Sequence, residues 1–362
     1  MSYSADEFSA RISSILERLN LQKSSIGVFV VSCVKGVTEP KDDFGLQSVV
    51  TEFFSSEEIE QILGSLRNCG LYVRPFFSEM DFIRFADSDK FDAGGRSRIL
   101  VYNTAHSGTG PGRKALLPCF CALHKIPITS SDAYVVSLAR HKFHIAHLLA
   151  RFGLQTPDSW LYTSEHGWLH GRQPTMGSKV ILKPTYESAS IGIRRNSVIT
   201  VGSDLDFHVE KIAAEFRQPI TVQAFIPGWE VEVPVINAGR PFAPMAIGIS
   251  KGGENFLGNE ILTYDDVNVD SYGFWKFQEN DAIVNTLKSS AIRASEILGM
   301  RGFTRIDFRV SAEGSAYITD VSTSPHITQH SSYAFLFETL GRPVDELPKI
   351  LVGIACENEH WI

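Results

Sequence analysis

Strand-like apolar runs alternate with amphipathic helical patterns along the first third of the chain. The helical pattern at 55–70 opens with a capping box, Ser55 and Glu58, and Gly70 stands where a helix C-terminal cap is expected. Strands that alternate with helices predict a parallel sheet with helical crossovers. The strand-like runs are IGVFVVSCV (26–34), LYVRPF (71–76), RILVYNTA (98–105) and IPIT (126–129).

After residue 130 the pattern changes to helices followed by antiparallel strands. Helices are expected at 131–140, 142–153, 203–216 and 282–298. We expect Ser203 to cap the third of them and Gly299 to end the fourth. Strands are expected at 178–186, 191–200, 221–226, 230–236, 244–249, 303–310 and 315–321. This order predicts an α+β architecture for the second part of the chain.

Composition and charge narrow the class of protein. With 43% hydrophobic and 21% charged residues, 28 glycines and 16 prolines, the chain is globular, not fibrous or disordered. A length of 362 residues suggests two or three domains, with clefts between them. The net charge is −7 and the basic residues form no run, so we do not expect nucleic acid as a partner.

The sequence contains no sign of export or of a membrane partner. Residues 1–20 form an amphipathic pattern of mixed charge, unlike a secretory signal. No apolar run approaches the roughly 20 residues of a membrane span. The five cysteines include no CxxC pair, which argues against a zinc site or a disulfide framework. We therefore expect a soluble, cytoplasmic protein.

A glycine-rich segment, SGTGPGRK (107–114), follows a predicted strand and opens a predicted helix. Ligands bind at such places in open α/β sheets, although a flexible loop has the same composition. The spacing matches neither the GxxxxGK[ST] phosphate-binding loop nor the GxGxxG dinucleotide motif. A dehydrogenase is therefore not supported.

Lys183 is embedded in an apolar strand and is followed by a small, hydroxyl-rich turn at 187–192. Buried lysines need an anionic partner, and the consecutive N–H groups of such a turn suit a phosphate. The alternative is a surface hairpin in which the lysine reaches solvent.

Two aspartates, Asp307 and Asp320, stand thirteen residues apart on strands joined by a short turn. Their carboxylates can emerge at one end of the hairpin, where hard oxygen ligands could hold Mg²⁺ against substrate phosphates. The alternative is a salt bridge to Arg305 or Arg309.

Gln223 and Glu230 flank the connection AFIPGW. An amide and a carboxylate at this spacing could hydrogen-bond an adenine and a ribose. A strand face exposed to water would carry the same residues, so the pair alone decides nothing.

In this order, these segments resemble the ATP-grasp superfamily, and most closely its D-alanyl-D-alanine ligase branch. The resemblance runs from about 98 to about 335. It is carried by SSDAYVVSLARHKFHIAHLLARFGLQTPDSWLY (130–162) and by GFTRIDFRVSAEGSAYITDVSTSPHITQHSS (302–332). It implies an α/β fold with a Rossmann-like N-terminal domain (1–132), followed by a two-part ATP-grasp module (133–222 and 223–362).

Roles carried over from the family form four groups. The residues that would contact ATP are Lys142, Lys183, Glu187, Ser190, Gln223, Phe225, Ile226 and Glu230. The residues that would bind magnesium, or alternatively manganese, are Asp307, Asp320 and Ser322. Catalysis falls to Arg305, which would stabilise the acyl phosphate, and to His330, which could act as a base for the incoming amine. Binding of the substrate carboxylate falls to Ser331 and Ser332.

The chain departs from the family pattern on the metal and substrate sides. Asp320 replaces a glutamate, Ser322 an asparagine and His326 a glycine. Ala189 replaces a serine that interacts with a substrate-side tyrosine. Neither that tyrosine nor the family's N-terminal glutamate, which holds the ammonium of the first D-alanine, has a clear counterpart. The sequence therefore supports use of ATP better than use of D-alanine.

The resemblance implies an ATP-dependent carboxylate–amine ligase that acts on amino acids or similar small molecules through an acyl phosphate. A ring-closing ligase that uses one substrate and a nucleotide-binding module without turnover are the alternatives. The segments 250–258 and 261–274 are the candidates for a lid over the site. The family is commonly dimeric, so a homodimer is the expected assembly.

Overall fold

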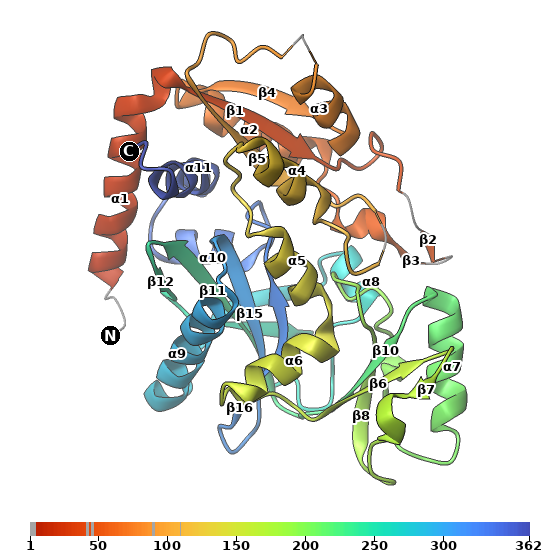
Figure 1. The fold of residues 1–362 in the computed structure, drawn as a ribbon. Coiled ribbons are helices and arrows are strands. Elements are labelled where there is room, and N and C mark those ends of the chain that lie inside the picture. Colours follow the sequence, from red (N-terminus) through yellow and green to blue (C-terminus); the bar gives the residue numbers. More distant parts are fainter. Residues whose placement is uncertain (1–4, 41–42, 45–46, 89–90, 109) are drawn as a thin grey trace.

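Three β-sheets form the framework of the computed structural model, which describes residues 5–40, 43–44, 47–88, 91–108 and 110–362 (Figure 1). They contain three, five and six strands, and a two-stranded ribbon, β2 (Asp43–Phe44) with β3 (Gln47–Ser48), lies apart from them. The mixed α/β class expected from the sequence is confirmed. No helix of the described ranges combines the length and apolar character that crossing a membrane requires.

The N-terminal sheet is parallel, as the alternation of apolar runs predicted. Its order is β4 (Tyr72–Phe76), β1 (Ile26–Ser32), β5 (Arg98–Thr104). Every residue of β1 is buried, because a central parallel strand is covered on both faces. The helices of this part are α1 (Ala5–Gln22), α2 (Ser56–Asn68), α3 (Glu79–Ala86) and α4 (Leu116–His124).

The capping box of α2 is present as predicted. Ser55 Oγ accepts a hydrogen bond from the Glu58 backbone N–H at 3.1 Å, and the Glu58 carboxylate accepts one from the Ser55 N–H at 2.8 Å. The chain leaves the helix through Gly70, whose φ of +90° suits glycine. The predicted strand 126–129 was wrong, because only Ile128 bridges to Val101 before the chain turns away from the sheet.

The second sheet is antiparallel and precedes the third in the chain. Its order is β7 (Gly167–Trp168), β6 (Ser159–Thr163), β10 (Ile220–Ala224), β8 (Lys179–Pro184), β9 (Val198–Thr200). Helix α7 (Leu205–Phe216) packs on it, and α5 (Ala133–Arg140) and α6 (Lys142–Arg151) lead into it.

Two sequence-based predictions for this part were wrong. The strand expected from 191 starts only at Val198, because the preceding residues form consecutive turns in which the Ile193 N–H donates to the Ser190 carbonyl. The cap of α7 is Asp204, and its side chain makes no capping hydrogen bond.

The third sheet supplies most of the C-terminal core. Its order is β14 (Tyr272–Lys276), β13 (Ile247–Lys251), β11 (Trp229–Ala238), β15 (Gly302–Val310), β16 (Ala316–Ser322), and β12 (Arg240–Phe242) pairs with β11. Helix α9 (Asp281–Leu298) packs on it through Leu287 and Ala291, and a short helix, α8 (Tyr264–Asn268), lies between β13 and β14. The predicted 303–310 and 315–321 strand pair is confirmed as β15 and β16.

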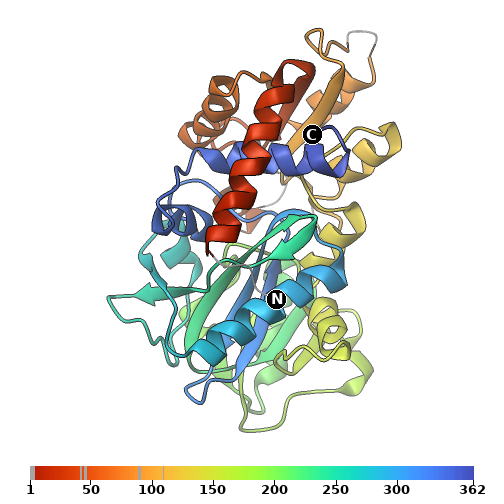
Figure 2. The same cartoon turned by 90° about the vertical axis from the view of Figure 1, so that its left-hand side faces the viewer.

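The last two helices, α10 (Ser332–Thr339) and α11 (Glu346–Asn358), return the chain to the N-terminal sheet. Helix α11 packs against α1 and α2, and Figure 2 shows α1 crossing it. Gly353 permits this contact, since a Cβ there would lie 2.4 Å from Ile15 Cγ2. The two ends of the chain thus share one core, while the domain limits 1–132, 133–222 and 223–362 stay a prediction.

We expect Gly228→Ala to destabilise the fold by about 3 kcal/mol, because the added Cβ would lie 1.8 Å from the Val310 carbonyl oxygen at a φ of +155°. Thermal and urea unfolding would measure the loss. The control is Gly64→Ala in α2, where the added Cβ would meet no described atom within 4 Å other than its chain neighbours and the backbone of its own helix, and a gain of up to about 1 kcal/mol is expected. Equal stabilities for the two variants would contradict the packing described at Gly228.

Candidate active site

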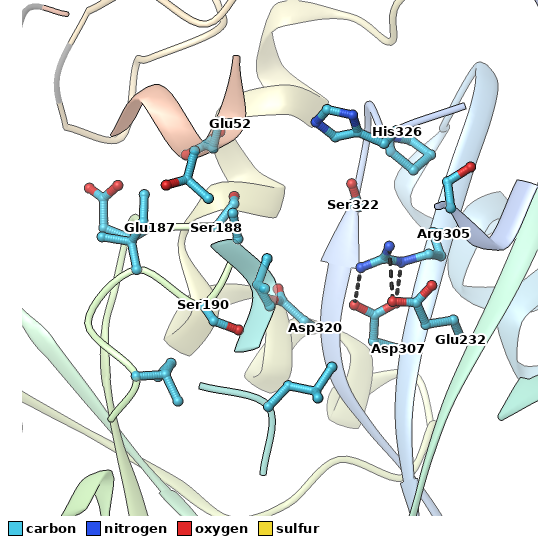
Figure 3. A pocket seen from close by; sticks show the side chains of 18 of the residues that line it. Glu52, Glu187, Ser188, Ser190, Glu232, Arg305, Asp307, Asp320, Ser322 and His326 are labelled. Carbon is cyan, nitrogen blue, oxygen red and sulfur yellow. Dashed lines mark hydrogen bonds and ion pairs between the residues drawn. The ribbon is translucent and has the colours of Figure 1, made fainter. Parts of the chain in front are cut away.

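A cavity of about 610 Å³ is lined by strands of the second and third sheets and by segments outside the strands of the N-terminal sheet, which supply Glu52, His106 and Lys114. Its volume lies within the usual range for small-molecule sites. Figure 3 shows Glu187, Ser188 and Ser190 on one side and Arg305 and Asp307 on the other. Apart from Ser332, the residues assigned from the sequence line this one cavity.

The two lysines expected at ATP occupy one stretch of the wall. Lys183, on β8, donates a hydrogen bond to Gln223 Oε1 at 3.0 Å, across the β8–β10 pair. Burial lowers the pKa of Lys183 to about 8, although Asp320 opposes this shift. Lys142, the first residue of α6, donates to the Glu187 carbonyl and lies 3.2 Å from Asp320 Oδ2. Both ammonium groups therefore face the cavity with few anionic partners.

The turn at 187–190 is shaped by residues with positive φ. Ala189 has φ +50° and Ser190 φ +54°, conformations that non-glycine residues rarely adopt. The Glu187 carboxylate turns away from the turn and is held by Arg113 at 3.1 Å and by Gln218 at 3.0 Å. The groups of this turn that could hydrogen-bond a phosphate are therefore its backbone N–H groups and the Ser190 side chain.

Arg309, on β15, organises the end of the cavity where adenine and ribose are expected. It donates to the carbonyls of Ile226 at 3.0 Å and Gly258 at 2.7 Å, and lies 3.3 Å from Glu230 Oε2. The guanidinium also stands 5.2 Å from the centre of the Phe225 ring. It therefore fixes the positions of both backbone and side-chain groups that were assigned to the nucleotide.

Arg305 links two acids on the opposite wall. Its guanidinium donates two hydrogen bonds to Asp307, at 2.7 and 2.8 Å, and lies 3.0 Å from Glu232 Oε1 (Figure 3). The salt bridge considered as the alternative for Asp307 is thus present. Sequence reasoning missed Glu232, whose Oε2 has no hydrogen-bond partner in the described part of the chain. Burial, opposed by Arg305, raises the pKa of Glu232 to about 7. The sequence feature that could have indicated Glu232 is its place as the second acid in the apolar run EVEVPVI (230–236).

The residues assigned to magnesium lie on two paired strands. Asp307 and Asp320 are directly opposite in the β15–β16 register, and Ser322 is opposite Arg305. Burial raises the pKa of Asp320, but Lys142 and Lys183 more than compensate and hold that pKa below its usual value. The described residues include no group of three or more His, Cys, Asp or Glu side chains arranged for a metal. Two carboxylates opposite each other nevertheless suit Mg²⁺, which takes one or two of them and completes its shell with phosphates and water.

The three residues predicted in the segment before α10, His330, Ser331 and Ser332, have different surroundings in the structure. Ser331 caps the helix, since its Oγ accepts from the Ala334 N–H at 3.1 Å and donates to the Thr328 carbonyl at 2.7 Å. Ser332 is buried and is absent from the cavity wall. His330 has φ +51°, and its ring packs 4.6 Å from that of Tyr272, which also lines the cavity.

A second carboxylate, Glu58, fastens this segment to α2. Thr328 Oγ1 donates to Glu58 Oε1 at 2.5 Å, and His326 Nδ1 lies 3.8 Å from the same oxygen. The His326 ring also packs 4.5 Å from the Phe54 ring. Burial alone would raise the pKa of Glu58, but the His326, Thr328 and Ser55 hydrogen bonds lower it to about 2.

Sequence reasoning also missed a buried group of charges on the N-terminal side of the cavity. Glu52, which the sequence analysis did not single out, is buried and lies in the cavity wall. Lys114 and Arg113, from the glycine-rich segment, lie 2.9 and 3.2 Å from its oxygens. These residues come from loops whose pairing the sequence pattern does not encode.

Comparison with known proteins points in one direction. The family model described as "D-ala D-ala ligase C-terminus" matches residues 148–353. A D-alanine–D-alanine ligase of Bordetella petrii is 24% identical over 334 residues, which cover 90% of this chain and 98% of the relative. One of Chlorobium limicola is 31% identical over 187 residues, covering 51% of this chain and 49% of the relative.

Solved structures agree. The D-alanine–D-alanine ligase of Bacillus anthracis complexed with ATP has a TM-score of 0.69 at 16% identity, over 92% of this chain and 98% of that chain. The VanG D-Ala:D-Ser ligase of Enterococcus faecalis has a TM-score of 0.66 at 17% identity, over 91% and 99%. At these identities the likeness shows the fold.

A parallel sheet followed by two antiparallel sheets, with lysines and paired acids between them, defines the ATP-grasp class of ligase folds. Since the matched family model spans more than half of the chain, the protein belongs to the D-alanine–D-alanine ligase family. The resemblance inferred from the sequence and the assignment to ligase enzymes of this type are confirmed.

We expect the Glu58 contacts to stabilise the fold in a pH-dependent way. The pKa of Glu58 is lower in the folded protein than its ordinary value of 4.5, so its contribution is present above pH 4.5 and is lost as the pH falls toward 2. Glu58→Gln should therefore remove roughly 2 to 3 kcal/mol at pH 7, and much less near pH 2. Unfolding free energies measured from pH 2 to 7 test this. Glu57→Gln, its exposed neighbour, is the control, and parallel pH profiles for all three proteins would refute the assignment.

Proposed function

We propose that the protein joins the carboxyl group of one amino acid or similar small molecule to the amino group of another, at the expense of ATP. Membership of the family supports the reaction type. The observation that carries the proposal is that Lys142 and Lys183, the paired Asp307 and Asp320, and Arg305 line a single cavity. The two lysines that would bind the phosphates and the arginine that would stabilise the acyl intermediate therefore line the same cavity.

In this proposal ATP lies along the second sheet. Gln223 would meet the adenine amino group, the backbone at Phe225 and Ile226 the ring edge, and Glu230 the ribose hydroxyls. Arg309 holds that end in place through Ile226 and Glu230. Lys142 and Lys183 would contact the phosphates, and the turn carrying Glu187 and Ser190 would cover them.

Asp307 and Asp320 would hold Mg²⁺, with Ser322 as a weaker oxygen ligand. When bound, the ion would neutralise charge on the phosphates of the nucleotide. Arg305 and Lys142 lie 2.7 and 3.2 Å from Asp307 and Asp320. In the proposed complex the same two cations would also meet the acyl group and the phosphates.

The reaction has two steps. A carboxylate oxygen of the first substrate attacks the γ-phosphorus, the bond to the bridging oxygen breaks, and ADP leaves an acyl phosphate behind. The amine of the second substrate then attacks the acyl carbon, loses a proton, and phosphate departs. Arg305 would stabilise the negative oxygen of the tetrahedral intermediate. His330, beside Tyr272, would bind or deprotonate the second substrate.

Water must be kept from the acyl phosphate. Of the two expected lid segments, 261–274 supplies Ile261, Val267, Asp270 and Tyr272 to the cavity wall, while 250–258 supplies none of the wall residues. The segment 261–274 therefore serves as the cover. Lys251 ties the two together, since its Nζ donates to Asp266 Oδ2 at 2.7 Å and to the Ile261 carbonyl at 3.0 Å.

The direct test is phosphate release from MgATP with amino acids offered singly and in pairs, followed by mass spectrometry. A product whose mass equals two substrates minus water establishes the ligase. Stimulation by a single compound, with loss of one water from it, would establish the ring-closing alternative. Tight binding of ATP without any stimulation would leave the non-catalytic module as the function.

Asp307→Asn is expected to lower kcat by on the order of 10²-fold or more, because it removes a magnesium ligand and the partner of Arg305. Magnesium titration of the residual activity should show weaker apparent affinity. Asp281→Asn, the same change at an exposed position at the start of α9, is the control and should act like wild type. Unchanged activity and magnesium dependence in Asp307→Asn would sink the metal assignment.

A further inference from the structure

The N-terminal side of the cavity contains a buried cluster of ionisable side chains. Apart from Glu187, whose turn would cover the ATP phosphates, the proposed reaction gives them no role. We call it the cationic cluster, and its members are Glu52, His106, Arg113, Lys114, Arg140 and Glu187. All but Arg113 line the cavity. Glu52 and Glu187, with Ser188 and Ser190 beside them, lie across the view from Arg305 (Figure 3).

The two carboxylates of the cluster are already occupied. Glu52 Oε2 lies 2.9 Å from Lys114 Nζ and 3.1 Å from His106 Nδ1, and Glu52 Oε1 lies 3.2 Å from Arg113. Glu187 is bound by Arg113 and Gln218. Burial by itself would raise the pKa of Glu52, but the cations around it hold that pKa well below its ordinary value. Glu52 therefore stays ionised, and its charge is neutralised inside the cluster.

The charges of the cluster do not balance. Arg113, Lys114 and Arg140 face two carboxylates, which leaves one positive charge in excess when His106 is neutral. Burial, helped by Lys114, lowers the pKa of His106 to about 3, so the imidazole is neutral at pH 7. Another acid, Glu79, makes no ion pair within 4 Å in the described ranges and is absent from the cavity wall. Burial also raises its pKa.

Arg140 is the member that the protein leaves unsatisfied. Its side chain is only 5% exposed, and none of its three guanidinium nitrogens has a hydrogen-bond partner among the described residues. The nearest carboxylate oxygens, of Glu52 and Glu187, lie 3.7 and 4.0 Å from it. A buried guanidinium without hydrogen bonds is costly, and it is a donor set ready for a planar anion such as a carboxylate.

The backbone that presents Lys114 is strained as well. Lys114 has φ +71°, which non-glycine residues rarely adopt and which the surrounding structure must hold. It ends the glycine-rich segment that the sequence marked as a ligand loop. Such strain concentrates at binding sites, where it positions a side chain.

We propose that the cationic cluster binds a further carboxylate, distinct from the carboxyl group that reacts and from the α-carboxylate of the amine donor assigned to Ser331, so that one of the two substrates is an acidic amino acid or another dicarboxylate. This proposal rests on the ligase function proposed above. An ammonium group would be repelled, because the cluster carries an excess positive charge and its unpaired group, Arg140, is a cation. Lys142 and Lys183, which pair with Asp320 and Gln223 instead, remain available to the phosphates of ATP.

The first experiment uses the wild-type enzyme, so no variant has to fold. Aspartate and glutamate, in both enantiomers, are compared with asparagine and glutamine by the kcat/KM for phosphate release and by product mass. Each amide has the shape of its acid without the charge. The acid should be preferred about 30-fold or more, as expected for a buried charge pair. Equal use of acid and amide, or of alanine, would overturn the proposal.

The second experiment asks which part of the cluster is responsible. Arg140→Gln should raise the KM for the acidic substrate about 30-fold and abolish the preference for acid over amide, while calorimetry shows ATP bound as before. Lys114→Met should act in the same direction if Arg140→Gln fails to fold. The matched control is Arg151→Gln, at an exposed position at the end of α6, which should behave as wild type. Weakened ATP binding with the acid preference intact would overturn the proposal, because the anion would then be a phosphate.

Failure of this inference is distinguishable from failure of the ligase function. Ligation of neutral amino acids with no preference for acids would leave the function standing and remove the inference. If no pair is ligated, calorimetry of the same acids and amides against the protein with a non-hydrolysable ATP analogue still decides the matter. Selective binding of the acids would support the cationic cluster, and no selectivity would refute it.

Discussion

The pairing of β15 with β11 on one side and β16 on the other is the constraint on which the site depends. This register sets Asp307 opposite both Glu232 and Asp320, so three carboxylates are brought to one place in the sheet. Like charges at this separation would repel each other without the cations between them. Arg305 lies between the first two, and Lys142 reaches the third from α6.

The numbers of acidic and basic side chains differ between the two sides of the cavity. On the Arg305 side acids outnumber cations, which suits a metal ion and an incoming ammonium group. On the Glu52 side cations outnumber acids, and Arg140 is left without a hydrogen bond in the described chain. If the cationic cluster binds a carboxylate as proposed, a substrate that carries both signs of charge would be oriented by the charges of the cavity wall.

The departures from the family pattern have structural explanations in part. His326 stands where the family has a glycine, and it is used to tie α2 to the segment before α10 through Glu58 and Phe54. Its ring therefore helps to join Phe54 and helix α2 to the segment before α10. Tyr272, on β14, packs on His330 and lines the cavity.

The sequence by itself determined the elements and the strand-borne residues of the site. Alternating apolar patterns and capping residues predicted the parallel sheet, helix α2 and the β15–β16 hairpin, because such signals are local. The family pattern then marked Lys183, Arg305 and Asp307, which a strand holds at a fixed spacing. Segments such as 126–129 and 191–197 were misread, since one bridge or a run of turns can carry the same apolar residues as a strand.

Only the tertiary structure decided what the loops bring together. Glu52, Lys114 and Arg140 belong to three separate segments, and nothing in their local sequences indicates that they share a buried site. Ser331 and Ser332 look equivalent in the sequence, yet one caps a helix at the cavity and the other is buried away from it. The physical reason is that charge balance and burial are properties of the packed cavity, whereas the sequence pattern reports only the periodicity of each element.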